Sequence, residues 1–243
     1  MKLRPLRLEL KYVVHHHVKA MLMARWQRYL VRAPFTNEHA ITPILSQYYD
    51  SPTLSFYEEK VDGIEMRNKV RLRVYGHDYR AGQTAFLEIK HRQGDKVRKY
   101  RQLLRDFGPH VLDPANWTFD DDAMRAAFST LRERYRLRPS AQVYYQREAW
   151  EGAADRDVRV TWDSCLLALH PGEPLTRERL FDPSRRMMAD TLAVLEIKAT
   201  TSLPPWVHEG VIAAELRQQT VPKYVTAVEV LGLDKTAASG IYA

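Results

Sequence analysis

The sequence predicts a mainly β fold of the α+β class, either a barrel or a sandwich of antiparallel strands with helices at its periphery. Three observations lead to this class. Short segments alternate apolar with charged residues, glycine-containing turn signals separate them, and only a few stretches have helical periodicity. The 243 residues exceed an average domain, but closed β-barrels reach this length as one unit. We therefore expect a single domain at 1–232 and a C-terminal tail at 233–243.

Alternation of apolar and charged residues predicts most elements in the first half of the chain. Leu8, Leu10 and Tyr12 alternate with Glu9 and Lys11, which is the period of a half-buried strand. Glycines between the later alternating segments mark turns. The expected elements are strands at 6–14, 44–49, 69–75, 85–92 and 96–104, a helix at 18–31 and a short helix at 55–60.

The second half of the chain returns to strands after one well-marked helix. The segment 120–136 has an acidic first turn and a basic last turn, the distribution that the helix dipole favours. The segment 223–231 is either strand-like or an irregular closing segment. The other expected elements are strands at 141–150, 158–163, 166–170 and 191–200 and a helix at 204–219.

Composition and charge limit the class of partner. The net charge of +7 and the sequence pI near 9.4 favour an anionic partner. No apolar run approaches the roughly 20 residues that span a bilayer, and the first residues do not resemble a secretory signal. A single cysteine, Cys165, excludes an internal disulfide and fits a reducing compartment. We therefore expect a cytoplasmic protein.

Several predicted strands carry charge on one face. A glutamate stands two residues before a lysine at Glu9/Lys11, Glu88/Lys90 and Glu196/Lys198. A solvated face is the ordinary explanation for one such strand, but solvated faces also hold serine, threonine and glutamine, and these hold few. If the sheet closes with its charged faces inward, the interior is a cationic tunnel. Arginine and lysine would then bind phosphate oxygens, and carboxylates would hold a divalent metal.

These motifs, in this order, resemble the triphosphate tunnel metalloenzymes, a superfamily also called CYTH-like. Within it, they are most similar to the polyphosphate polymerase domain of the vacuolar transporter chaperone family, of the bacterial type. The motifs are Glu9-Leu10-Lys11-Tyr12, Tyr48-Tyr49-Asp50-Ser51, Arg71-Leu72-Arg73, Leu87-Glu88-Ile89-Lys90, Lys99-Tyr100-Arg101, Tyr145-Gln146-Arg147-Glu148, Val158-Arg159-Val160-Thr161 with Asp163, Leu195-Glu196-Ile197-Lys198 and Lys223-Tyr224.

The resemblance implies a closed antiparallel eight-stranded β-barrel that transfers the ATP γ-phosphate onto polyphosphate with Mn²⁺ or Mg²⁺. By position, the catalytic residues would be Lys11, Arg71, Arg73, Lys90, Arg147 and Lys198. Further phosphate contacts would come from Lys99, Arg101, Arg159, Lys223 and Tyr49. Glu196 is the first choice as metal ligand, followed by Glu88 and Glu9.

Other functions remain open at the level of the sequence. Arg7 stands where many hydrolytic tunnel enzymes have the first of two glutamates, which favours the polymerase branch over a triphosphatase. A non-catalytic sensor of polyphosphate or inositol phosphates could share every basic residue, and a cyclase of the same superfamily could present ATP in the same tunnel. We expect ATP and polyphosphate as ligands and no nucleic acid, since no nucleic-acid-binding motif is present. Any attachment to a membrane would go through a partner protein.

Overall fold

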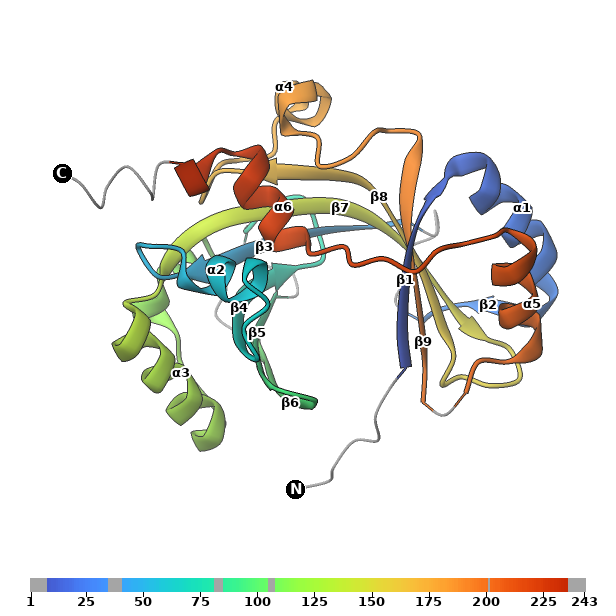
Figure 1. Cartoon of the computed structure of the whole chain (residues 1–243). Helices are drawn as coiled ribbons and strands as arrows, with labels where there is room; N and C mark the ends of the chain where they lie inside the picture. Colours follow the sequence, from blue (N-terminus) through green and yellow to red (C-terminus); the bar gives the residue numbers. More distant parts are fainter. Residues whose placement is uncertain (1–7, 35–40, 81–84, 105–107, 201, 236–243) are drawn as a thin grey trace. The chain divides into compact units, whose positions relative to one another are not determined.

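A computed structural model describes residues 8–34, 41–80, 85–104, 108–200 and 202–235 (Figure 1). The chain divides into two compact units, and each is formed from three separate stretches of sequence. Unit 1 contains residues 1–42, 145–166 and 188–221, and unit 2 contains residues 43–144, 167–187 and 222–243.

The strands form one sheet of nine members. They are β1 (Leu8–His15), β2 (Leu30–Arg32), β3 (Ile41–Asp50), β4 (Met66–Val74), β5 (Ala85–Gln93), β6 (Lys96–Leu104), β7 (Arg138–Gly152), β8 (Arg159–Leu169) and β9 (Leu192–Ala199). Their hydrogen-bonded order is β1-β9-β8-β7-β3-β4-β5-β6, and β2 also pairs with β7. A mainly antiparallel sheet with helices is therefore confirmed. Among the described residues this order ends at β1 and β6, so closure into an eight-stranded barrel is not confirmed.

Six α-helices accompany the strands in the described part of the chain. They are α1 (His16–Trp26), α2 (Ser55–Val61), α3 (Asp122–Tyr135), α4 (Arg177–Phe181), α5 (Pro205–Ala213) and α6 (Lys223–Val230). Short 3₁₀ helices occur at η1 (Gln27–Tyr29), η2 (Pro109–Leu112), η3 (Pro114–Asn116) and η4 (Pro183–Arg185). Helix α3 begins where Asp121 accepts hydrogen bonds from two backbone N–H groups, and it ends at Arg136, whose φ is 51°. None of the described helices has the length and apolar character needed to span a bilayer.

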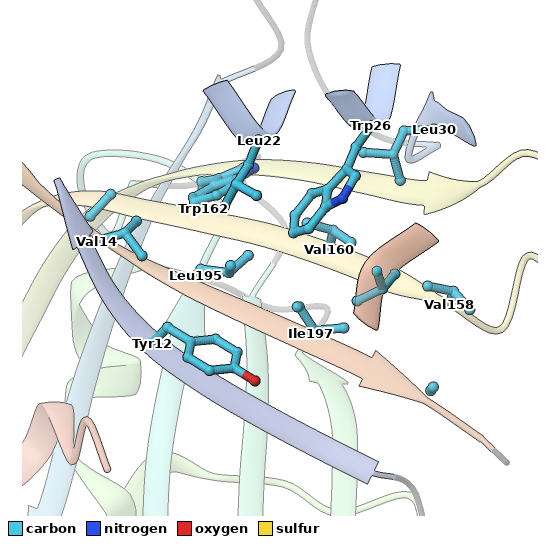
Figure 2. Packing of buried hydrophobic residues seen from close by; sticks show 13 residues of the cluster. Tyr12, Val14, Leu22, Trp26, Leu30, Val158, Val160, Trp162, Leu195 and Ile197 are labelled. Atoms are coloured by element: carbon cyan, nitrogen blue, oxygen red, sulfur yellow. The ribbon is translucent and has the colours of Figure 1, made fainter. Parts of the chain in front are cut away.

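The core of unit 1 lies between α1 and one face of β1, β8 and β9. Figure 2 shows Leu22 and Trp26 of the helix pointing toward Val160 and Trp162 of β8, with Leu195 of β9 nearby. All five are at most 1% exposed. The Trp26 indole donates a 3.0 Å hydrogen bond to the backbone oxygen of Trp206 in α5. A Cβ at Gly210 of α5 would clash with the Trp26 indole, so glycine permits this close approach.

The core of unit 2 lies on the apolar face of β4 and β5. Leu72 and Leu87, which are paired in register, are completely buried there. Helix α3 contributes Phe128, whose ring lies 4.8 Å from that of Trp117. Because side chains alternate along a strand, burial of this face turns the charged residues of β4 and β5 toward the other. Apolar burial thus fixes which side of the sheet carries the charge.

Two predictions about the bounds of elements were wrong. The helix expected at 18–31 ends at Trp26, and Leu30–Arg32 instead pairs with the end of β7 as β2. Pairing with a neighbouring strand thus overrides helical periodicity in this segment. The two strands expected at 158–163 and 166–170 form the single strand β8. Cys165 has a φ of 53° inside it, a left-handed conformation that explains the interruption seen in the sequence pattern.

Two predictions about the C-terminal region also need correction. The helix expected at 204–219 is shorter, because α5 ends at Ala213 and Glu215 has a φ of 49°. The segment expected to be strand-like or irregular at 223–231 is helix α6. The predicted tail lies outside the described residues from 236 onward. Its first residues, 233–235, are helical and follow the turn at 231–232.

Candidate anion-binding faces

Unit 1 carries a charged face on the side of β1, β8 and β9 opposite its core. In the register of the strands, Lys11 lies opposite Glu196, and Lys198 lies between Glu9 and Arg159 on its two neighbours. Each of these pairs between β1 and β9 joins a cation to a carboxylate, which stabilises the pairing, whereas Lys198 and Arg159 on β9 and β8 are both cations. The charged face of unit 1 consists of Glu9, Lys11, Arg147, Arg159, Asp163, Glu196 and Lys198.

Arg147 is the most constrained cation of this face. Its Nε and Nη2 atoms donate hydrogen bonds of 2.6 and 2.7 Å to the two carboxylate oxygens of Asp163, which is fully buried. Nη2 also lies 3.7 Å from Glu196. Burial would lower the pKa of the Arg147 guanidinium, but Asp163 raises it above its ordinary value. Arg147 is therefore held in one orientation, with a permanent charge.

Glu196 lies among three cations. It forms an ion pair with Lys198, and Lys11 and Arg147 are close enough to affect its ionisation. Burial alone would raise the pKa of the Glu196 carboxyl, but these three cations hold it well below its ordinary value. The carboxylate therefore stays ionised over the whole physiological range.

The rest of this face is more open. Arg159 lies 3.1 Å from Glu151, and its side chain is 48% exposed. Thr161 stands opposite Glu196, and its buried Oγ1 atom has no hydrogen-bond partner in the described part of the chain. Lys11 lies 2.6 Å from Glu9 on the same strand.

Unit 2 carries a second face, which we call the cationic face, on β3 to β6. Strand register arranges its side chains in three rows that run across the sheet. The lysine row is Lys69, Lys90 and Lys99, the middle row is Tyr48, Arg71, Glu88 and Arg101, and the third row is Ser46, Arg73, Phe86 and Leu103. These rows hold six cations and one carboxylate. Lysines directly opposite one another repel, so the lysine row favours binding of an anion.

Glu88 neutralises the arginines of the cationic face. Its carboxylate lies 2.6 Å from Arg71 Nε, 3.4 Å from Arg101 Nε and 3.8 Å from Arg73 Nε. Burial would raise the pKa of the Glu88 carboxyl, but Arg71 and Arg73 lower it. Arg71 also donates a 3.4 Å hydrogen bond to the hydroxyl of Tyr48.

Tyr48 is an unusual member of the cationic face. Its ring is buried, which alone would raise the pKa of the phenol, yet Arg71, Lys69 and Arg73 lower it to about 8. The lowered pKa follows from the three cations that surround the hydroxyl.

Two buried polar atoms of the third row have no hydrogen-bond partner among the described residues. They are Nε of Arg73 and Oγ of Ser46, which lie opposite each other in the register of β3 and β4. An unpaired donor on a buried arginine is costly, and such groups commonly mark the place of an ion, a water or a ligand. An anion with several oxygens would satisfy both atoms.

Tyr49, a predicted phosphate contact, faces the other way. It pairs with Val70 on the apolar face, and its hydroxyl donates a 2.9 Å hydrogen bond to the backbone oxygen of Leu112. Burial raises the pKa of the Tyr49 phenol well above its ordinary value. Of the Tyr48-Tyr49 pair, only Tyr48 shares a face with Arg71.

Lys223 is the first residue of α6 rather than part of a strand. The next residue, Tyr224, stacks on Tyr48 with ring centroids 5.1 Å apart, and its hydroxyl donates a 2.6 Å hydrogen bond to the buried carboxylate of Asp50. These two contacts hold the start of α6 against β3, and they place Lys223 beside the cationic face.

The three predicted metal ligands are divided between the units, with Glu9 and Glu196 in unit 1 and Glu88 in unit 2. Among the described residues, no three His, Cys, Asp or Glu side chains are grouped so that they could hold a metal ion. Mg²⁺ often binds through one or two carboxylates and completes its shell with substrate phosphates and water. Glu196 and Glu88 are each a single ionised carboxylate among three cations, so either would hold such a metal only together with substrate phosphates.

Sequence reasoning found most charged members of both faces but missed several of their neighbours. Asp163 was noticed as part of a motif, yet its pairing with Arg147 was not foreseen, although two-residue alternation from Arg159 places it on the charged face. The same alternation from Arg71 reaches Lys69, and from Glu88 it reaches Phe86. The lack of hydrogen-bond partners at Ser46 and Arg73 had no signal in the sequence.

Comparisons with known proteins agree on one family. The model of the VTC domain family matches residues 6–232. Subunit 4 of the vacuolar transporter chaperone complex of Trypanosoma brucei brucei is 21% identical over 268 residues, which cover 90% of this chain and 33% of that protein. The chain thus spans about a third of the length of that relative.

A solved structure supports the fold. It is described as a proposed adenylate cyclase of Bacillus halodurans, and it matches with a TM-score of 0.54 at 10% identity over 89% of this chain and 94% of that one. At this identity the likeness concerns the fold alone. Because the family model covers almost the entire chain, the chain belongs to the VTC domain family.

Proposed function

We propose that this chain is a metal-dependent polyphosphate polymerase that transfers the γ-phosphate of ATP onto a polyphosphate chain. The observation that carries the proposal is the cationic face of unit 2, where six cations accompany one carboxylate and the buried Nε of Arg73 has no hydrogen-bond partner among the described residues. Such a face is stabilised by a ligand with many anionic oxygens. The closed tunnel belongs to this proposal and rests on the family resemblance.

The reaction needs charge neutralisation more than a protein nucleophile. A terminal oxygen of the polyphosphate chain attacks the γ-phosphorus in line, a new P–O bond forms, and the bond to the β–γ bridging oxygen breaks to release ADP. The attacking oxygen is already an anion, so no side chain has to remove a proton from it. Arginine and lysine lower the repulsion between the two polyanions and hold the reacting groups in line.

The two charged faces would contribute differently to this chemistry. Arg147 is fixed by Asp163 and keeps its charge, so it offers a preorganised contact for phosphate oxygens. Arg71 and Arg73 present their charges beside Glu88, which prevents excessive repulsion in the absence of ligand. Lys69, Lys90 and Lys99 would follow a phosphate chain along one row.

A divalent metal, Mn²⁺ or Mg²⁺, would be held by Glu196 together with phosphate oxygens of the substrate. When bound, it would neutralise charge that develops on the transferred phosphoryl group. Lys11 and Lys198 flank the Glu196 carboxylate and keep it ionised, so it is available to a metal at neutral pH.

The named relative is a subunit of a complex, and we extend the proposal to partners on that basis. The chain would act in the cytoplasm, and other proteins of such a complex would connect it to a membrane. Co-purification of the tagged chain with proteins of its own cell would test this part.

The central test is turnover by the purified chain. We would incubate it with ATP and Mn²⁺, with and without a short polyphosphate primer, and follow products by gel electrophoresis and phosphorus NMR. We expect long phosphoanhydride chains and ADP. Arg73→Met should slow their formation by about 10²-fold or more, since it removes a preorganised donor. Glu196→Gln should reduce turnover and weaken its dependence on Mn²⁺.

Matched controls lie on the exposed ion pair between Arg25 and Glu209 in unit 1. Arg25→Met and Glu209→Gln change the net charge by the same amounts as the test substitutions and should leave turnover unchanged. Release of phosphate or pyrophosphate without chain growth would replace the proposal with a triphosphatase or a cyclase. Tight polyphosphate binding without any turnover would indicate a sensor.

A further inference from the structure

The cationic face of unit 2 changes character along its strands. The lysine row at one end is wholly cationic, and the third row carries Phe86 and Leu103 beside Arg73. Tyr75 follows the last residue of β4 on the same face, and its ring meets that of Phe86 edge-on with centroids 6.0 Å apart. One end of the face thus suits phosphate, and the other presents flat apolar groups.

Arg101 joins the middle row to this aromatic end. Its guanidinium lies 3.7 Å from the centroid of the Phe86 ring, and its Nη2 atom donates a 3.3 Å hydrogen bond to the Tyr75 hydroxyl. Glu88 anchors the same guanidinium at 3.4 Å. These three contacts fix the orientation of the guanidinium plane, although 49% of the Arg101 side chain is exposed. A planar, exposed arginine of this kind stacks readily on a nucleobase.

The apolar groups around Arg101 are accessible as well. Tyr75 is 38% exposed and Leu103 is 42% exposed, and both belong to the face that carries the cations. The face therefore offers a ring, a guanidinium plane and an aliphatic side chain next to Arg73, whose buried Nε has no hydrogen-bond partner among the described residues.

We infer that Arg101, Phe86, Tyr75 and Leu103 form a stacking platform for the base of a nucleoside triphosphate. The inference deepens the proposed function and rests on it, because it assigns the direction in which the nucleotide lies on the cationic face. Phe86 and Lys90 are four residues apart on β5, which corresponds to about 13 Å along the strand. That span is comparable to the length of an extended nucleoside triphosphate, so the base rests on the platform while the terminal phosphates reach the lysine row.

The platform predicts a preference for nucleotide over bare phosphate chains. Stacking on aromatic and guanidinium surfaces accepts any base, because every base has a π-face. The preference should therefore separate ATP and GTP from inorganic tripolyphosphate, while ATP and GTP should bind with similar affinity. Arg73 and Arg71 would contact the phosphates nearest the sugar.

The test measures binding rather than turnover. Isothermal titration of the full-length chain would compare ATP with inorganic tripolyphosphate in the presence of Mg²⁺. Phe86→Leu and Tyr75→Leu should each weaken ATP binding by about 10-fold and leave tripolyphosphate binding unchanged. Tyr100→Leu is the matched control, because Tyr100 occupies the opposite face of β6 and should affect neither ligand.

The outcomes separate this inference from the proposed function. If wild-type protein binds ATP no more tightly than tripolyphosphate yet makes polyphosphate, the platform is wrong and the polymerase stands. If neither ligand binds, both ideas fail. Should the variants unfold, transferred NOEs between adenine ring protons and aromatic protons in the wild-type protein decide the matter, and their absence at saturating ATP would overturn the platform.

Discussion

At the scale of single residues, the two faces use arginine in contrasting ways. Arg147 is only 18% exposed and donates to both oxygens of the fully buried Asp163, whereas Arg159 is about half exposed beside Glu151. A buried pair has little net effect on stability while it is intact, but its loss leaves the remaining charge buried and unpaired. An exposed pair is screened by water, and its loss costs little.

We predict that Arg147→Met lowers the free energy of unfolding by about 3–5 kcal/mol, because the buried carboxylate of Asp163 would lose the two hydrogen bonds that Arg147 donates. Arg159→Met removes the same charge from the same face and should cost less than about 1 kcal/mol. Urea denaturation of the three proteins, followed by tryptophan fluorescence, would check the difference. Equal losses in the two variants would contradict the assigned pairing.

Single residues also show where sequence reasoning on the site succeeded and where it failed. Strand alternation located Lys11, Arg71 and Glu196 on charged faces. One face of each strand is buried in the core, so the charged side chains must point to the other face. It gave no basis for naming Tyr49 rather than Tyr48, since two adjacent tyrosines fit either register. Hydrogen-bond satisfaction at Arg73 depends on neighbouring strands, so no local pattern reveals it.

At the scale of elements, Asp50 connects the end of β3 to two helices of unit 2. Its carboxylate accepts hydrogen bonds from the backbone N–H groups of Phe56 and Tyr57 in α2 and from the hydroxyl of Tyr224 in α6. The first two satisfy donors at the start of α2 that have no partner within the helix. Burial nevertheless raises the pKa of the Asp50 carboxyl to about 6.

This raised pKa predicts a particular pH dependence. Between about pH 4 and pH 6 the folded protein keeps a proton on Asp50 that the unfolded chain has already lost. The folded state then binds more protons, so the contribution of Asp50 to stability falls as the pH rises through this window. From pH 4 to pH 7 the loss should be on the order of 2–3 kcal/mol.

Asp50→Asn removes the titration of Asp50. Comparison of this variant with the wild type therefore separates the contribution of Asp50 from those of the other titratable groups. We expect the difference in unfolding free energy, wild type minus Asp50→Asn, to decrease by that amount between pH 4 and pH 7. Urea denaturation at four or five pH values would measure it. A difference that is constant or that increases with pH would show that Asp50 does not keep the proton in the folded protein.

Prediction of the elements succeeded where periodicity was strong and failed where a neighbouring segment decided the structure. The strand at 96–104 was predicted with its observed bounds, because charge alternation and flanking glycine both mark it. Helix α6 was predicted to be a strand-like or irregular segment, although Tyr224, Val225 and Val228 are buried at helical spacing after Pro222. Leu30–Arg32 could not be recognised as a strand, since only pairing with β7 makes it one.

At the scale of the whole molecule, the excess positive charge is distributed over both units. Unit 1 balances its charged face with Glu9, Asp163 and Glu196, whereas the three rows on unit 2 have one carboxylate, Glu88. The net charge of +7 is therefore most concentrated, among the described strands, on β4 to β6. Division into units was not visible in the sequence, because each unit combines three distant stretches of chain.

This distribution predicts where a polyphosphate ligand protects the protein. A ligand that binds the folded state raises the free energy of the local openings that allow amide hydrogen exchange. If both faces bind phosphate, polyphosphate should slow exchange in β4, β5 and β6 of unit 2 and in β1, β8 and β9 of unit 1. Helix α3 contributes to the core of unit 2 and carries none of the predicted site residues, so its exchange should change least.

Hydrogen exchange followed by mass spectrometry, with sulfate at equal ionic strength as the control, would measure this protection. Protection limited to one unit would assign phosphate binding to that face alone, and turnover without protection at either face would contradict the proposed site.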